Sequence, residues 1–197
     1  HLGRTGEAKS PAQIISTIGD SNLVAISGGD LFSFFLDENG KVYSCGDGRY
    51  GILGHGDTNN CNIPTRITNT IGDSNIVAIS VNYQHSLFLD DLGNVYSCGK
   101  GQLGNGNTDD VYSPERIDTF KDSDGTSITD TPVIVAISGG GSGNNFSLFL
   151  DNLGNVYSCG EGSLGQLGHG NTNDKSSPTR INNCLLYTSD AADELCR

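Results

Sequence analysis

The pentapeptide Val-Tyr-Ser-Cys-Gly occurs three times in this chain, and each copy belongs to a longer module that repeats with it. The copies are Val42–Gly46, Val95–Gly99 and Val156–Gly160. Val-Ala-Ile-Ser, Leu-Asp, Leu-Gly and Pro-x-Arg-Ile recur around every copy in the same order. A single module of this kind cannot bury its own apolar face, so successive modules must stack on one another. The repetition therefore constrains the architecture more than any single residue does.

The length and local pattern of the repeat favour a β-propeller. The three copies start 53 and 61 residues apart, which suits a blade of short strands and is too long for a leucine-rich or ankyrin repeat. Runs such as Ser86–Asp90 are rich in apolar residues and are bounded by Gly, Asn and Asp. Leu87 and Leu89 fall on one face of this predicted strand and Phe88 on the other, so we expect both faces to be covered. The repeats carry no helical apolar period, and we expect an all-β fold.

The second module carries a family resemblance. His85–Gly99, followed by Gly101–Thr108 and Pro114, resembles the repeat of the regulator of chromosome condensation family, whose members fold as seven-bladed β-propellers. The resemblance covers about residues 2–181 and rests on several spaced motifs that repeat in register. The family usually has Trp in the last strand motif, where this chain has cysteine, and we interpret each cysteine as a smaller core residue. These positions are Cys45, Cys98 and Cys159.

The repeat register divides the chain into modules. We expect full repeats at about 23–67, 76–117 and 135–181, and a partial repeat at 1–14. This predicts about three four-stranded antiparallel blades plus a fragment of a fourth, arranged as an open arc and not as a closed ring. Residues 1–183 are therefore interpreted as a fragment of a propeller. We interpret 184–197 as a non-native tail, because it breaks the register and resembles a translated sequencing adapter.

Composition excludes several classes of partner. The formal net charge is −12 and the chain has no Lys/Arg cluster, so we expect no direct binding to nucleic acid. It has no apolar run long enough to span a bilayer, so we expect no membrane partner. The three repeat cysteines lie at equivalent positions of successive blades, which makes them poor candidates for disulfides. Buried free thiols favour an intracellular location, cytoplasmic or nuclear.

Motifs that suggest catalysis or ligand binding fail on inspection. Gly46–Gly51 fits Gly-x-Gly-x-x-Gly, but a turn sequence follows it, whereas dinucleotide binding requires a helix N-terminus. His85 has Phe32 and Phe146 as its counterparts in the other modules, which indicates packing and not catalysis. No Cys or His pair has the spacing of metal ligands, and Asp122–Gly125 fails the EF-hand register. We therefore expect no enzyme activity, no cofactor and no metal.

Two departures from the repeat pattern mark candidate partner-contact loops. The linker after Ile117 is eight residues longer than the linker after Ile67, and three further residues are added between Gly139 and Asn145. Insertions on a repeat scaffold map to loops, and loops carry binding, although a solvated insertion without a partner is the alternative. The candidate contact residues are Asp118, Lys121, Asp122, Asp124, Asp130, Asn144 and Asn145. The glycines with an expected structural role are Gly46, Gly99, Gly160, Gly54, Gly104 and Gly168.

These observations predict a non-catalytic scaffold for protein–protein interaction, with an unidentified protein partner. The resemblance implies one alternative, in which the chain is part of a guanine-nucleotide exchange factor for a small GTPase, as the founding member of the family is. That activity requires face residues from several blades of a closed ring. Ultraviolet photoreception, another role in the family, depends on a tryptophan cluster, and this chain contains no Trp.

Overall fold

The fold is that of a partial propeller. The computed structural model describes residue 18 and residues 22–141 and 145–182, and these residues form three four-stranded antiparallel sheets. The all-β, open-arc architecture predicted from the repeats is thereby confirmed. The predicted partial repeat at 1–14 and the tail at 184–197 lie outside the described residues. The strands are β1 (Leu23–Gly28), β2 (Phe32–Asp37), β3 (Val42–Gly46), β4 (Cys61–Arg66), β5 (Ile76–Val81), β6 (His85–Asp90), β7 (Val95–Gly99), β8 (Val111–Arg116), β9 (Ile134–Gly140), β10 (Phe146–Asp151), β11 (Val156–Gly160) and β12 (Lys175–Arg180), and a short 3-10 turn, η1 (Arg49–Gly51), follows β3.

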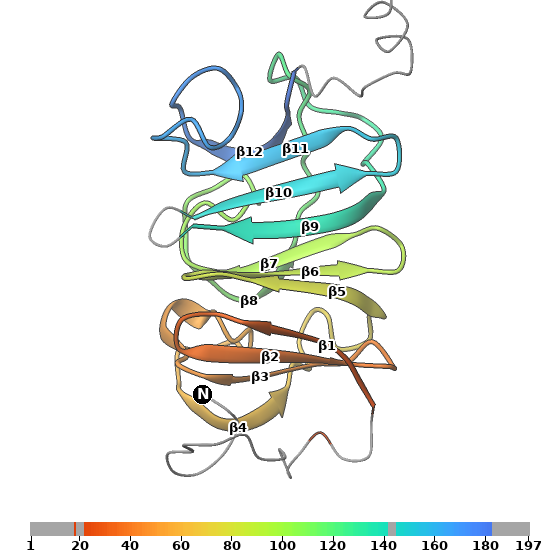
Figure 1. The fold of residues 1–197 in the computed structure, drawn as a ribbon, viewed down its shortest axis with the longest axis vertical. Helices are drawn as coiled ribbons and strands as arrows, with labels where there is room; N and C mark the ends of the chain where they lie inside the picture. The colour runs from red at the N-terminus through yellow and green to blue at the C-terminus, as the bar shows by residue number, and fades with distance from the viewer. Residues whose placement is uncertain (1–17, 19–21, 142–144, 183–197) are drawn as a thin grey trace, which may run out of the picture.

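Each sheet is one blade, built from four strands that follow one another along the chain. The first blade contains β1–β4, the second β5–β8 and the third β9–β12, and neighbouring strands in each blade are neighbours in sequence. The three blades stack face to face (Figure 1), and the first strands β1, β5 and β9 lie next to one another. We call the contact between the first and second blades the first junction, and that between the second and third blades the second junction.

The hairpin between the second and third strands of each blade explains the repeated Leu-Asp and Val-Tyr motifs. In the second blade, Asp90 Oδ1 accepts hydrogen bonds from the backbone N–H groups of Leu92 and Asn94 at 3.0 and 2.8 Å. Gly93 has φ +83°, a conformation that side-chain-bearing residues rarely adopt. The hydroxyl of Tyr96 donates to Asp90 Oδ2 at 3.2 Å. Asp37 and Asp151 make the same set of contacts, so each hairpin is specified locally by its own sequence.

Apolar side chains alternate along the central strands and fill both junctions. Phe88 is fully buried in the cluster of the first junction, together with Phe34 of the first blade. Leu87 and Leu89, its neighbours in the same strand, are buried in the cluster of the second junction. The predicted division of this strand between two covered faces is therefore confirmed. Leu150, the third-blade counterpart of Leu89, has no following blade among the described residues and is 37% exposed, against 3% for Leu89.

The repeated cysteines and glycines meet across the junctions. Cys45, Cys98 and Cys159 are fully buried at the same position of the third strand of each blade. A Cβ atom on Gly104 would lie 3.0 Å from the sulfur of Cys159, and one on Gly54 would lie 3.4 Å from that of Cys98. The glycine of one blade thus leaves room for the thiol of the next. Gly46, Gly99, Gly160 and Gly168 also have positive φ angles.

Candidate functional site

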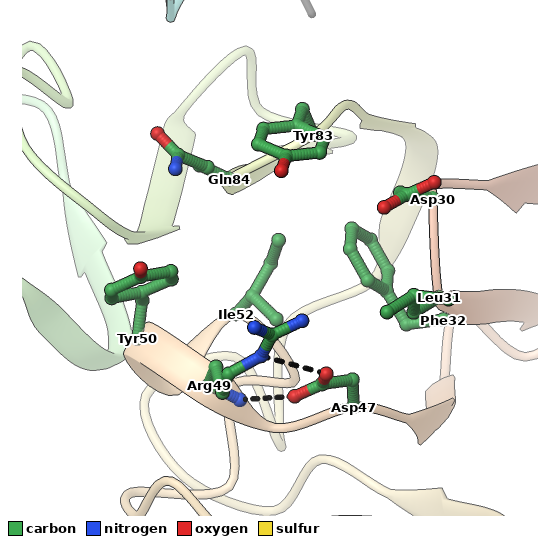
Figure 2. Close-up of a pocket in the computed structure, with 9 residues that line it drawn as sticks. All are labelled: Asp30, Leu31, Phe32, Asp47, Arg49, Tyr50, Ile52, Tyr83 and Gln84. Atoms are coloured by element: carbon green, nitrogen blue, oxygen red, sulfur yellow. Dashed lines mark hydrogen bonds and ion pairs between the residues drawn. The ribbon is translucent and has the colours of Figure 1, made fainter. Parts of the chain in front are cut away.

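A pocket opens at one end of the first junction, where three loops from two blades converge. The turn between β1 and β2 supplies Asp30 and Leu31, and the turn between β5 and β6 supplies Tyr83 and Gln84. The loop after β3, which includes η1, completes the wall (Figure 2). The pocket is a small depression open to solvent, with a cavity volume of about 50 Å³. The nine residues that line it are Asp30, Leu31, Phe32, Asp47, Arg49, Tyr50, Ile52, Tyr83 and Gln84.

The loop after β3 contacts the second blade, where η1 lies against β7 and β8, and the second blade has a shorter loop at the equivalent place. Seven residues lie between the repeat glycines Gly46 and Gly54 of the first blade, whereas four lie between Gly99 and Gly104 of the second. Tyr50 belongs to the extra segment, and the Lys100 ammonium lies 4.8 Å from the centre of its ring. This distance is that of a cation–π contact. The longer loop of the first blade thus contacts the second blade through Tyr50.

The pocket has an apolar floor and an aromatic rim. The buried side chains of Phe32 and Ile52 form the floor. Tyr50 and Tyr83 stand at the rim and remain 37% and 45% exposed, and Leu31, across the pocket from Tyr50, is also exposed. Tyr50 has φ +62°, a positive value that residues other than glycine rarely adopt. Such a conformation costs about 1–2 kcal/mol. The fold thus holds an exposed tyrosine in a strained position at the edge of a hollow.

The polar groups of the pocket are oriented by neighbours. The backbone N–H and the Nε of Arg49 donate to the two carboxylate oxygens of Asp47 at 3.0 and 2.8 Å (Figure 2). The side chain of Asp47 is largely covered, whereas that of Arg49 is largely exposed. On the facing wall, Asn145 Nδ2 donates to Gln84 Oε1 at 2.9 Å. The side chains of Arg49 and Gln84 are therefore held in defined directions without a ligand.

At the same end of the second junction, a buried polar cluster replaces the pocket. His85, the counterpart of Phe32, is fully buried, and its Nε2 lies 2.9 Å from Ser147 Oγ of the third blade. Asn82 donates to the carbonyl oxygen of Gly140 at 2.8 Å, which adds a second polar contact between the blades. Burial lowers the pKa of His85 to about 4, so the imidazole is neutral near pH 7. This histidine links two blades and is buried away from solvent.

The predicted partner-contact loops lie away from the pocket, with one exception. The insertion after Ile117 packs against β12 at the opposite end of the blades, where the backbone of Lys121 is hydrogen-bonded to Pro178 and Arg180. Asp118 forms an ion pair with Arg116 and Asp122 one with Arg180, while Asp124 accepts bonds from Thr126 and Asp130 is exposed. Asn145 is buried and contacts the pocket through Gln84, and Asn144 lies outside the described residues. Their role in partner contact stays a prediction.

The remaining titratable groups have structural surroundings. His55 and His169 lie 2.9 Å from the hydroxyls of Ser44 and Ser158 in their own blades, and burial lowers the pKa of both. Burial raises the pKa of the Cys98 and Cys159 thiols, which keeps them protonated and unreactive. Within the described part of the chain, no group of three His, Cys, Asp or Glu side chains could hold a metal ion. No described helix is long and apolar enough to cross a membrane.

The stacked four-stranded blades define the chain as a β-propeller repeat protein. A family model for the regulator of chromosome condensation (RCC1) repeat matches residues 39–89, 93–150 and 154–186, and a second model for this repeat matches 23–52 and 76–105. The chain therefore belongs to the RCC1 repeat family, as the resemblance of its second module indicated.

Several curated relatives share the repeats. The chain is 29% identical over 183 residues to the ultraviolet-B receptor UVR8 of Arabidopsis thaliana, covering 91% of the chain and 38% of the receptor. It is 37% identical over 141 residues to protein RCC2 of Mus musculus, covering 70% of the chain and 24% of that protein. Against the human E3 ubiquitin-protein ligase HERC2 it covers 80% of the chain and 3% of the ligase, at 29% identity. The chain thus spans less than two fifths of the length of these relatives.

Solved structures confirm the fold. Human WBSCR16 superposes with a TM-score of 0.70 at 23% identity, covering 82% of the chain and 38% of that protein. Prp20p from Saccharomyces cerevisiae, a protein described with its binding properties to Gsp1p and histones, superposes with a TM-score of 0.66 at 24% identity, covering 83% of the chain and 39% of Prp20p. At this level of identity the likeness concerns the propeller architecture alone.

Proposed function

We propose that this chain is a non-catalytic protein-binding module, and that the pocket of the first junction receives a side chain of a protein partner. The observation that carries the proposal is the exposed rim of Tyr50 and Tyr83 around a preformed hollow with an apolar floor. Tyrosine and arginine are enriched at the energetic centres of protein interfaces, and tyrosine loses little conformational entropy on binding. The strained backbone of Tyr50 adds support, because strain of this kind clusters at binding sites.

The chemistry of the described residues favours binding over catalysis. Their histidines are neutral near pH 7 and hydrogen-bonded within or between blades, and the thiols of Cys98 and Cys159 are protonated. The glycine loop after β3 leads into one 3-10 turn, which lacks the helix N-terminus that would bind a cofactor phosphate. The free thiols of Cys61, Cys98 and Cys159 favour an intracellular location, cytoplasmic or nuclear.

A random peptide library displayed on phage tests this function. The wild-type chain should enrich binding peptides, and a Tyr83→Ala variant should lose most of that enrichment because it removes one side of the rim. Leu164→Ala is the control for the loss of an exposed apolar side chain, since Leu164 is 83% exposed and is not among the residues that line the pocket. Unchanged far-UV circular dichroism would show that each variant is folded. Equal enrichment by wild type and Tyr83→Ala would refute the proposed use of the pocket.

Guanine-nucleotide exchange on a small GTPase is the alternative proposal, and it concerns a longer propeller than the three blades described. Release of a fluorescent guanine nucleotide from a candidate GTPase, measured with the longer protein, is the direct test. Acceleration that survives Tyr83→Ala would assign exchange to another part of the propeller face. Acceleration that is lost in this variant would assign it to the face around the pocket.

A further inference from the structure

The pocket presents hydrogen-bond donors to a ligand. Asp47 occupies the Nε of Arg49, so the guanidinium plane is held by the ion pair. Figure 2 shows the two terminal nitrogens of Arg49 directed toward Ile52. An arginine held in this way offers a pair of parallel N–H donors, which matches the geometry of a carboxylate.

A second donor faces the same space from the other blade. Asn145 donates to Gln84 Oε1, which assigns the oxygen and nitrogen ends of the Gln84 amide. Figure 2 shows the nitrogen end directed toward the pocket and the oxygen end away from it. Lys100, held over the ring of Tyr50, adds a positive charge at the rim. Donors from two blades therefore favour a ligand group that accepts hydrogen bonds.

Other features limit the kind of anion. The floor of Phe32 and Ile52 is apolar, so a small apolar group beside the charged one finds an apolar contact there. Asp30 lies exposed on the rim opposite Arg49, and the chain as a whole carries a formal charge of −12. Both repel every anion, and they repel a doubly charged phosphate or a run of acidic residues more strongly than a single carboxylate. A single carboxylate fits these conditions.

We propose, resting on the protein-binding function above, that the pocket recognises a peptide segment in which one Asp or Glu adjoins an aromatic or aliphatic side chain. The carboxylate accepts hydrogen bonds from the terminal nitrogens of Arg49 and from Gln84. The apolar neighbour packs on Phe32 and Ile52 between the two tyrosines. The partner is thus a protein that exposes an isolated acidic–apolar pair.

The composition of the enriched phage peptides gives the first test. They should share one Asp or Glu beside an apolar residue, without a run of acids. Enrichment of peptides that lack a carboxylate would overturn this inference and leave the protein-binding function standing. Failure to enrich any peptide would refute both. The two proposals therefore fail in distinguishable ways.

Affinity measurements with one synthetic, fluorescein-labelled peptide of the enriched sequence give the second test. Arg49→Gln should weaken binding at least about tenfold, and so should replacement of the peptide's Glu or Asp by Gln or Asn. Made together, the two changes should weaken binding no more than either alone, because they remove the same contact. Arg116→Gln is the control, since Arg116 is also paired with an aspartate but lines no described pocket. Independent, additive losses would overturn the proposal.

A phosphorylated peptide separates the two kinds of anion. The same peptide with phosphoserine in place of its acidic residue should bind more weakly than the carboxylate form, because Asp30 and Asp47 oppose the second charge. Tighter binding of the phosphoserine peptide, or displacement of the carboxylate peptide by millimolar inorganic phosphate, would overturn carboxylate recognition.

Discussion

The two junctions between blades are built from the same repeat positions and yet end differently. In the first junction, the ring of Phe32 lies over Gly29, and a hollow remains above it. In the second, Asn82 and His85 take these two positions and bond across to the third blade. Both the apolar pair and the polar pair fit the same scaffold, because β1 and β2 pair in the same register as β5 and β6. The pocket lies at the first junction, where Gly29 and Phe32 stand in place of the polar pair.

The linkers that precede the junctions differ as well. The short linker of the first junction buries Ile71, whereas the long linker of the second buries Phe120. The ring of Phe120 contacts those of Phe149 and Tyr157 edge-on, with centroids 5.9 and 5.3 Å apart. The inserted segment therefore contributes to the core of the second junction. Repeated residues build the blades, and the non-repeated ones decide which junction is filled.

The largest expected effect comes from the long linker. Phe120→Ala should lower the free energy of unfolding by about 3–5 kcal/mol, because it leaves a cavity and removes two aromatic contacts. Ile71→Ala should cost less, since it deletes a smaller side chain without aromatic partners. Urea denaturation of both variants, with the exposed Thr119→Ala as control, measures the difference. A Phe120→Ala variant as stable as Thr119→Ala would show that the linker does not support the second junction.

The polar filling of the second junction should make stability depend on pH. Unfolded His85 binds a proton below about pH 6.5, whereas the folded protein resists it down to about pH 4. The contribution of His85 to stability should therefore be constant above about pH 7 and should fall by up to about 3 kcal/mol between pH 6.5 and 4.

His55 and His169, whose pKa values are also lowered by burial, add to the slope in the same direction. A His85→Gln variant isolates the contribution of His85, since glutamine keeps hydrogen-bonding groups and does not titrate. The difference in urea midpoint between wild type and this variant should change with pH across that window. A difference that is independent of pH would contradict the assignment to His85.

The smallest expected effect concerns the strained residue of the first junction. Tyr50→Asn should raise the free energy of unfolding by about 0.5–1 kcal/mol, because asparagine adopts positive φ more readily than tyrosine. The loss of the Lys100 cation–π contact offsets part of this gain. The same variant should bind enriched peptides more weakly. A variant that is less stable and binds normally would place Tyr50 in the scaffold and not in the binding site.

Much of the scaffold follows from the sequence by itself. The repeat length predicted the blades, and the alternation of Leu87, Phe88 and Leu89 predicted that this strand divides its side chains between two junctions. The Asp-x-x-Gly hairpin around Asp90 is specified within a few residues of chain. Such features are predictable because strand periodicity and turn hydrogen bonds act at short sequence separation.

The pocket was decided by the tertiary structure. Its walls come from Asp30, Arg49 and Tyr83, which no sequence pattern connects. The sequence shows that the second repeat is three residues shorter after its glycine. Which loop of the first blade lies against this shorter loop is decided by the packing of the blades. The polar composition around Phe120 likewise indicated an exposed loop, and its ring is buried in a junction. How space between blades is filled depends on residues far apart in the chain, so repetition predicts the blades and only their packing reveals the hollow.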